Sequence, residues 1–278
     1  MTEQKVALGK LLFADTRLSV SGTHSCATCH QPDLYFTDGL ARSNGALGEP
    51  LAFNTPTLIN SAYSTSFSWI DKKHASLEQQ HLGPLNNTDP VELGLSSDAL
   101  RALSADSLLL GALQRAFPDA KTFTQTNLIA ALASYVRSLI RGNDGFDRLL
   151  FDDDQNALTA RQQVGLTLFN SDRLNCAGCH RGFLLSGPTQ SIRASFTPSF
   201  YQTGVSGSTR RFRVPSLRFV QHTAPYMHDG SHASLEQVIE FYEAGGRGTL
   251  GAKAQERMAP FSLSIDERAA LLAFLRSL

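Results

Sequence analysis

The chain has 278 residues, 42% of them hydrophobic and 18% charged, which suits packed domains and excludes a disordered chain. At roughly 100–200 residues per domain, this length predicts two domains. The 25 basic and 25 acidic residues cancel, which excludes a nucleic-acid binder that relies on overall positive charge. No apolar run reaches the about 18 residues of a membrane span, and no signal-peptide pattern opens the chain, so we expect that any signal peptide has been removed or never existed.

In chain order, the first recognisable element is a Gly-x-x-Leu-Phe segment at residues 9–13, followed by an Arg-Leu dipeptide and a cysteine motif. The same series recurs from residues 165–169, again ahead of an Arg-Leu dipeptide and a second cysteine motif. Short strings recur by chance, but two copies in register with both cysteine motifs predict a duplicated module. We expect one domain over residues 1–150 and another over residues 151–278.

The four cysteines form two Cys-x-x-Cys pairs, each followed at once by a histidine: Cys26, Cys29 and His30, then Cys176, Cys179 and His180. Cys-x-x-Cys-His is the attachment signature of c-type haem, in which two thiols add across the vinyl groups and the histidine binds the iron. A zinc ribbon has its pairs about 15–20 residues apart, and a thioredoxin-like pair needs no histidine. The pattern therefore predicts two covalent haems, with His30 and His180 as iron ligands, and a periplasmic location.

The ligand on the second face of each haem iron decides whether the haem carries electrons or binds an oxidant. Methionine occurs only at positions 1, 227 and 258, and neither methionine nor histidine lies between His30 and His74. We therefore predict that the first haem has an open face that binds peroxide. His74 and His81 stay as alternatives, because either side chain could fold back over this haem.

The middle of the chain predicts helices and one linker. Residues 127–140 have apolar side chains at helical spacing, and the polar, Asp-rich residues 143–156 read as a linker between domains. Capping boxes predict the starts of two further helices, at Thr159 with Gln162 and at Ser264 with Glu267. Strand patterns are sparse, so the predicted fold class is all-α, with two cytochrome c-like domains that each hold one haem.

Residues 223–246 contain the candidates for the far ligand of the second haem. Ser234 with Gln237 predicts a capping box, and the glycines at 245 and 246 end the helix that it begins. On spacing alone, three side chains could bind the second iron: Met227, His228 and Tyr242. A tyrosine on a helix more often serves packing, so spacing leaves the choice open.

These motifs, in this order, resemble the bacterial dihaem cytochrome c peroxidase/MauG family over nearly the whole chain. The likeness runs from residues 8–13 through both haem motifs to residues 213–217 and 223–230. Three further segments look closest to the MbnH-like branch of the family, namely residues 36–39, 76–80 and 90–94. Members of this branch are MauG relatives that oxidise tryptophan on a partner protein of a copper-handling system.

The resemblance implies catalytic roles for three residues that would otherwise pass for surface or core positions. Gln80 and Glu92 match the pair above the open haem, with a slightly longer spacing than is usual in the family. Glu92 would move a proton from the near to the far oxygen of peroxide, and Gln80 would hydrogen-bond the bound oxygen. Trp69, the only tryptophan, matches the tryptophan between the haems and would carry an electron or a hole.

The resemblance also implies ligands for iron and calcium. Tyr242 stands where the peroxidases of the family carry a methionine ligand, as in MauG-like members, which also lack the distal histidine after the first motif. A phenolate stabilises high-valent iron, so a tyrosine ligand suits an enzyme that stores two oxidising equivalents, one on each haem. The inter-haem calcium site matches Asn54 with backbone oxygens of Thr223 and Pro225, which are ligands for a hard cation.

The motifs and the resemblance leave three functions open. The first is a peroxide-dependent dihaem oxidoreductase that removes electrons from an aromatic residue, a tryptophan, of a partner protein. The second is a cytochrome c peroxidase that reduces hydrogen peroxide to water with electrons from a small redox protein. The third is a dihaem electron carrier without catalytic activity. The sequence does not identify the partner, its modification or the oligomeric state.

Overall fold

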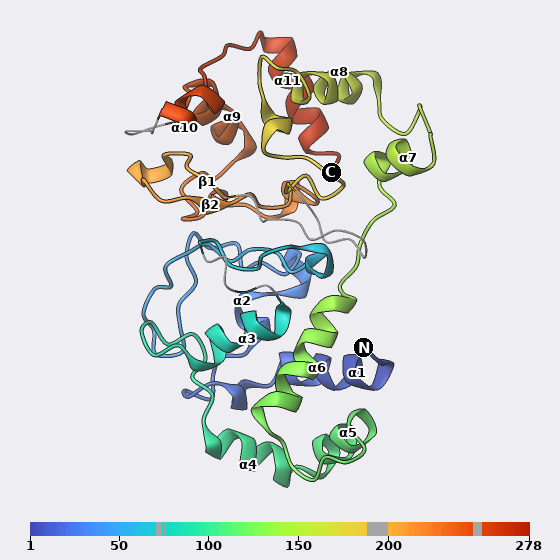
Figure 1. Cartoon of the computed structure of the whole chain (residues 1–278), viewed down its shortest axis with the longest axis vertical. Coiled ribbons are helices and arrows are strands. Elements are labelled where there is room, and N and C mark those ends of the chain that lie inside the picture. The colour runs from blue at the N-terminus through green and yellow to red at the C-terminus, as the bar shows by residue number, and fades with distance from the viewer. Residues whose placement is uncertain (71–73, 75, 188–199, 247–251) are drawn as a thin grey trace. The chain divides into compact units, whose positions relative to one another are not determined.

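The computed structural model describes residues 1–70, 74, 76–187, 200–246 and 252–278. The chain folds into two compact units, of which Figure 1 shows the helices and strands. The first unit comprises Met1–Asp38, Arg42–Phe67 and Lys73–Ile140, and the second comprises Gly39–Ala41, Ser68–Lys72 and Arg141–Leu278. The described part of the chain is mostly helical, as predicted, and no helix in it has the length and apolar character needed to cross a membrane.

The described helices of the first unit are α1 (Glu3–Phe13), α2 (Cys26–Cys29), α3 (Leu77–Asn86), α4 (Ser97–Ala105), α5 (Ser107–Ala116) and α6 (Gln125–Ser138). Helix α6 is the element predicted over 127–140, and it begins earlier because Thr124 and Asn127 form a capping box. Helix α1 packs against α6 and α5 (Figure 1), and its Leu8 and Leu12 are fully buried. Burial of these apolar faces holds the unit together.

The described helices of the second unit are α7 (Gly145–Phe151), α8 (Ala160–Phe169), α9 (Leu235–Glu243), α10 (Ala252–Arg257) and α11 (Ile265–Leu275). The two-residue strands β1 (Phe200–Tyr201) and β2 (Phe212–Arg213) pair antiparallel, with Phe200 opposite Arg213. Helices α8 and α11 pack against each other (Figure 1), and both begin at the capping boxes predicted for them. Their apolar faces form a core with Leu158, Leu174 and Ile239.

Two local predictions need correction. The Gln237 side chain accepts a hydrogen bond from the backbone N–H of Ala233 at 2.7 Å, so Ser234 caps α9 without the reciprocal bond of a capping box. The polar stretch 143–156 is not a plain linker, because α7 lies within it and the Phe146 ring packs edge-on against Phe274 at 5.9 Å. The buried Phe146 thus packs this stretch into the second unit, whose longest segment is Arg141–Leu278.

The two Gly-x-x-Leu-Phe segments make equivalent helix crossings. A Cβ atom at Gly9 would lie 2.1 Å from the Ala131 carbonyl oxygen of α6, and one at Gly165 would lie 2.1 Å from the Ala270 carbonyl oxygen of α11. The glycines therefore permit two backbones to approach more closely than any side chain would allow. The phenylalanine that ends each segment packs edge-on against an aromatic ring of the facing helix. Phe13 contacts Tyr135, and Phe169 contacts Phe274.

We expect Gly9→Ala to lower the free energy of unfolding by about 1–3 kcal/mol, because the methyl group must push α1 away from α6. Gly111→Ala is the matched control, since the nearest atom to a Cβ there is the Arg115 Nη1 atom at 3.5 Å. Alanine at this open helical position should stabilise the protein by up to about 1 kcal/mol. Denaturant unfolding of the haem-loaded variants measures both changes. Equal effects of the two substitutions would contradict the close crossing.

Candidate functional site

Each cysteine motif forms a single tight turn. In the first, Ser25 donates its N–H to the Thr28 hydroxyl at 2.9 Å, and the His30 N–H donates to the Cys26 carbonyl at 2.9 Å. In the second, the His180 N–H donates to the Cys176 carbonyl at 2.8 Å. Residues three and four apart on such a turn face the same side. Both motifs therefore present two sulfur atoms and one imidazole together.

The two motif histidines are oriented alike by backbone carbonyl groups. The Nδ1–H of His30 donates to the Phe36 carbonyl at 3.0 Å, and the Nδ1–H of His180 donates to the Leu185 carbonyl at 2.7 Å. This bond selects the tautomer that keeps Nε2 as the metal-binding nitrogen. Burial lowers the pKa of both imidazoles, which favours the neutral form that binds a metal.

None of the four cysteines forms a disulfide bond. Burial raises the pKa of Cys26 and of Cys176 to about 12. Burial is also the main cause that raises the pKa of Cys29 and Cys179. Redox-active and zinc-binding cysteines need the thiolate, which such surroundings disfavour. Neutral thiols beside an oriented imidazole fit thioether attachment of a c-type haem at each motif. Cys26, Cys29 and His30 would hold one, and Cys176, Cys179 and His180 the other.

Glu92 lies near the first motif. Burial raises the pKa of its carboxyl group, while a hydrogen bond from the Asn87 Nδ2 atom at 3.4 Å favours the charged form. Burial is the largest cause that raises the pKa of Cys26 and Cys29, and the Glu92 charge is a smaller one, so this carboxylate interacts electrostatically with both thiols. A carboxyl group with a raised pKa beside a haem attachment site is suited to proton transfer.

The two alternative histidines occupy different positions in the first unit. His74 bonds Gln80, with 2.8 Å between the imidazole Nδ1 and the amide Oε1. His81 is bonded through Nδ1 to the Leu77 carbonyl at 2.6 Å, one turn earlier on its own helix. Burial is the largest cause that lowers the pKa of His30, and the His81 charge is a smaller one, after the Phe36 bond and the Asp38 charge. His74 orients the Gln80 amide, and the approach of either histidine to the first haem stays a prediction.

In the second unit, Tyr242 lies next to the second motif. Burial raises the pKa of its phenol, and the charges of Cys179 and Cys176 raise it further. The other two candidate ligands are placed differently. Met227 has a left-handed backbone with φ 73°, and the His228 ring stacks on Phe212 with centroids 3.6 Å apart. The Tyr242 phenol thus interacts electrostatically with both cysteines of the second motif, and its assignment as an iron ligand stays a prediction.

Trp69 is buried and belongs to the second unit, while Gln80 and Glu92 belong to the first. Its carbonyl oxygen accepts a hydrogen bond from the Arg213 N–H at 2.8 Å. No local sequence signal links Arg213 to Trp69, because 144 positions separate the two residues. Nor does a local signal mark the carbonyl groups of Phe36 and Leu185, whose residues adopt left-handed backbones with φ 60° and 51°.

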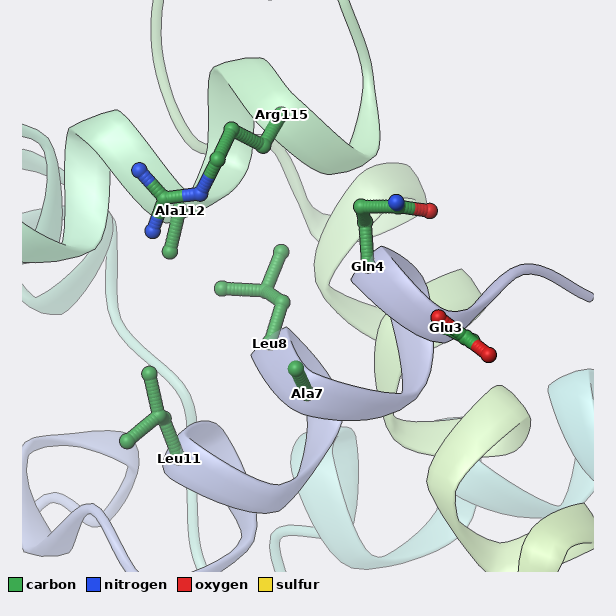
Figure 2. Close-up of a pocket in the computed structure, with 7 residues that line it drawn as sticks. All are labelled: Glu3, Gln4, Ala7, Leu8, Leu11, Ala112 and Arg115. Carbon is green, nitrogen blue, oxygen red and sulfur yellow. The ribbon is translucent and has the colours of Figure 1, made fainter.

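The predicted calcium ligands are distributed over both units. Asn54 is buried in the first unit, and Thr223 and Pro225 are part of the second. The assignment of these residues to calcium stays a prediction. A separate depression of about 230 Å³ lies between α1 and α5 (Figure 2) and is lined by Glu3, Gln4, Ala7, Leu8, Leu11, Ala112 and Arg115. None of these is a predicted site residue.

Comparisons with known proteins agree with this geometry. A family model described as di-haem cytochrome c peroxidase matches residues 3–155. Over its full length the chain is 37% identical to methylamine utilization protein MauG of Methylorubrum extorquens, covering 79% of that protein. It is 33% identical to cytochrome c peroxidase Ccp of Escherichia coli across 87% of this chain and 54% of that protein.

A solved structure, of a MauG-like protein associated with microbial copper homeostasis, has a TM-score of 0.89 and 32% identity over 100% of this chain and 90% of that one. The relatives are dihaem peroxidase-type enzymes, and two c-type haems follow from the family. The chain belongs to the di-haem cytochrome c peroxidase/MauG family.

Proposed function

We propose that this protein is a peroxide-dependent dihaem oxidoreductase that stores two oxidising equivalents, one on each haem, and uses them to oxidise a tryptophan of a partner protein. The observation that carries the proposal is the electrostatic interaction of the buried Tyr242 phenol with Cys176 and Cys179. A phenolate ligand stabilises oxidised iron, whereas a methionine ligand favours reduced iron. The similarity to a MauG-like protein associated with copper homeostasis supports the same branch.

The first unit supplies the residues that handle peroxide in this proposal. A haem held by Cys26, Cys29 and His30 provides the iron chemistry. Glu92 accepts the proton of one peroxide oxygen and returns it to the other, which makes water the leaving group. Gln80, whose Oε1 accepts a hydrogen bond from His74, would offer its amide N–H groups to the peroxide as hydrogen-bond donors.

Cys176, Cys179, His180 and Tyr242 of the second unit would hold the electron-transfer haem. The equivalent glycine crossings at Gly9 and Gly165 support duplication of one cytochrome c module. Trp69 is the route for an electron or hole. The proposal also includes a calcium ion, bound by Asn54 and by backbone oxygens of Thr223 and Pro225. It further includes a periplasmic location.

The second candidate is a cytochrome c peroxidase that takes electrons from a small redox protein. The electrostatic interaction of His81 with His30 favours it, because a histidine that binds the first iron must leave before peroxide can bind. The bond from His81 Nδ1 to Leu77 holds its ring against its own helix. Membership of an enzyme family argues against the third candidate, an electron carrier without catalytic activity.

Optical and electron paramagnetic resonance spectra of the ferric haem-loaded protein test the proposal. We expect one high-spin and one low-spin haem, a reaction with peroxide that needs no prior reduction, and a near-infrared band that reports charge shared between the haems. Two low-spin haems that become one high-spin haem in His81→Ala would instead favour the peroxidase. Two low-spin haems unaffected by His81→Ala would contradict both enzymes.

A further inference from the structure

Arg213 contacts Trp69 through both its backbone and its side chain. Its N–H donates to the Trp69 carbonyl at 2.8 Å, and its Nε–H donates to the Ser68 carbonyl at 3.3 Å. These two bonds lay β2 alongside the segment that carries the indole. They bring the guanidinium carbon to 5.9 Å from the centre of the buried Trp69 ring. At this distance a cation and an aromatic ring attract each other.

The charge of Arg213 is not neutralised by a neighbouring carboxylate in the part of the chain that the structure describes. Burial alone lowers the pKa of its guanidinium, to about 10, so the side chain is still a cation at neutral pH. The contrast is Arg218, whose guanidinium binds Asp144 and Asp147 in the same unit. The two carboxylates balance the charge of the Arg218 guanidinium, whereas the positive charge of Arg213 acts on the adjacent indole ring.

We propose that Arg213 is a positioning residue that raises the potential at which Trp69 loses an electron, so that holes pass through the indole without residing on it. The inference rests on the proposed function, in which Trp69 is the electron route. An attracted cation stabilises the neutral ring. The same cation repels the positive charge that the ring acquires when it is oxidised.

The step itself is a one-electron transfer. Peroxide is the oxidant of the proposed function and takes up two electrons, one from each haem. A hole reaches Trp69 when the indole gives one electron to an oxidised haem, with no bond broken and the indole proton retained. The indole is restored when it receives one electron from the substrate protein or from the second haem. A charge at about 6 Å with an effective dielectric of about 20 shifts this balance on the order of a hundredfold toward the neutral indole.

Three substitutions separate the charge from the hydrogen bond. Arg213→Lys keeps the charge, Arg213→Gln keeps a donor for Ser68 without the charge, and Arg213→Met removes both. All three keep the backbone bond to Trp69. Arg211→Gln is the matched control, because Arg211 is exposed, lies two residues away and loses the same charge. Absorbance of the attached haems and thermal unfolding show which variants are folded.

The measurement is freeze-quench electron paramagnetic resonance of the haem-loaded variants after peroxide. Trp69 is the only tryptophan, so protein labelled with indole-deuterated tryptophan assigns any radical to it. We expect little tryptophan radical in the wild type, Arg213→Lys and Arg211→Gln, and at least a tenfold larger signal in Arg213→Gln and Arg213→Met. Equal signals in all folded variants overturn the inference, as does an Arg213→Lys signal that matches Arg213→Met.

A second oxidation separates this inference from the proposed function. Flash-quench oxidation by a ruthenium photosensitiser removes an electron from Trp69 without peroxide. The yield of Trp69 radical should again rise at least tenfold in Arg213→Gln over the wild type and stay unchanged in Arg213→Lys. If peroxide fails to oxidise both haems while this pattern appears, the proposed function fails and the role of Arg213 stands. If the pattern is absent, the role of Arg213 fails regardless of the peroxide reaction.

Discussion

Glu92→Gln should slow the reaction of the ferric protein with hydrogen peroxide by about 10²–10⁴-fold, because glutamine cannot accept and return a proton. The substitution keeps the size of the side chain and its hydrogen-bonding contact with Asn87, so both haems should stay attached. Stopped-flow absorbance of the haem bands measures the rate constant. Glu49→Gln, at an exposed position, is the control and should leave the rate unchanged.

The pH dependence follows from the direction of the Glu92 pKa. Burial raises this pKa, so the carboxyl group takes up its proton at a higher pH than an ordinary glutamate does. A base must be deprotonated to work, so the wild-type rate should fall as the pH drops through this raised value. Glu92→Gln should lack that acid limb. An acid limb of the same midpoint in the variant would assign the proton transfer to another group.

Tyr242→Phe should abolish the near-infrared band that forms after peroxide while leaving both haems attached. Phenylalanine retains the ring that packs edge-on against Phe241 at 5.4 Å and removes only the oxygen atom proposed to bind the second iron. Without that anion the second haem is harder to oxidise, so both oxidising equivalents cannot be stored. Oxidation of a partner tryptophan should fall at least tenfold, which mass spectrometry of the partner measures.

Tyr201→Phe is the control, because Tyr201 is a half-buried tyrosine of the same unit on β1. Its ferric spectrum and near-infrared band should match those of the wild type. If Tyr242→Phe also leaves both unchanged, the tyrosine ligand is refuted. A loss of the band in Met227→Leu would then assign the second iron to methionine and favour the peroxidase that uses a small redox protein.

The haem motifs and several helix starts are local features, and the sequence alone therefore predicted them. Each motif occupies five consecutive residues, and its turn is closed by bonds within that span, as in the His30 bond to Cys26. The capping boxes at Thr159 and Ser264 likewise need only residues three positions apart. The two Gly-x-x-Leu-Phe segments could be recognised in the sequence, because a close helix crossing requires a residue as small as glycine.

Only the tertiary structure revealed contacts between segments that are distant in the sequence. It shows that the buried Tyr242 phenol interacts electrostatically with both cysteines of the second motif, and that Phe146 packs the polar stretch around it into the second unit. The Arg213 side chain bonds Ser68 across 145 positions of sequence, a pairing that no local pattern encodes. The physical reason is the range of the forces: hydrogen bonds within a turn are specified by adjacent residues, whereas burial and charge act between segments that meet only once the chain has packed.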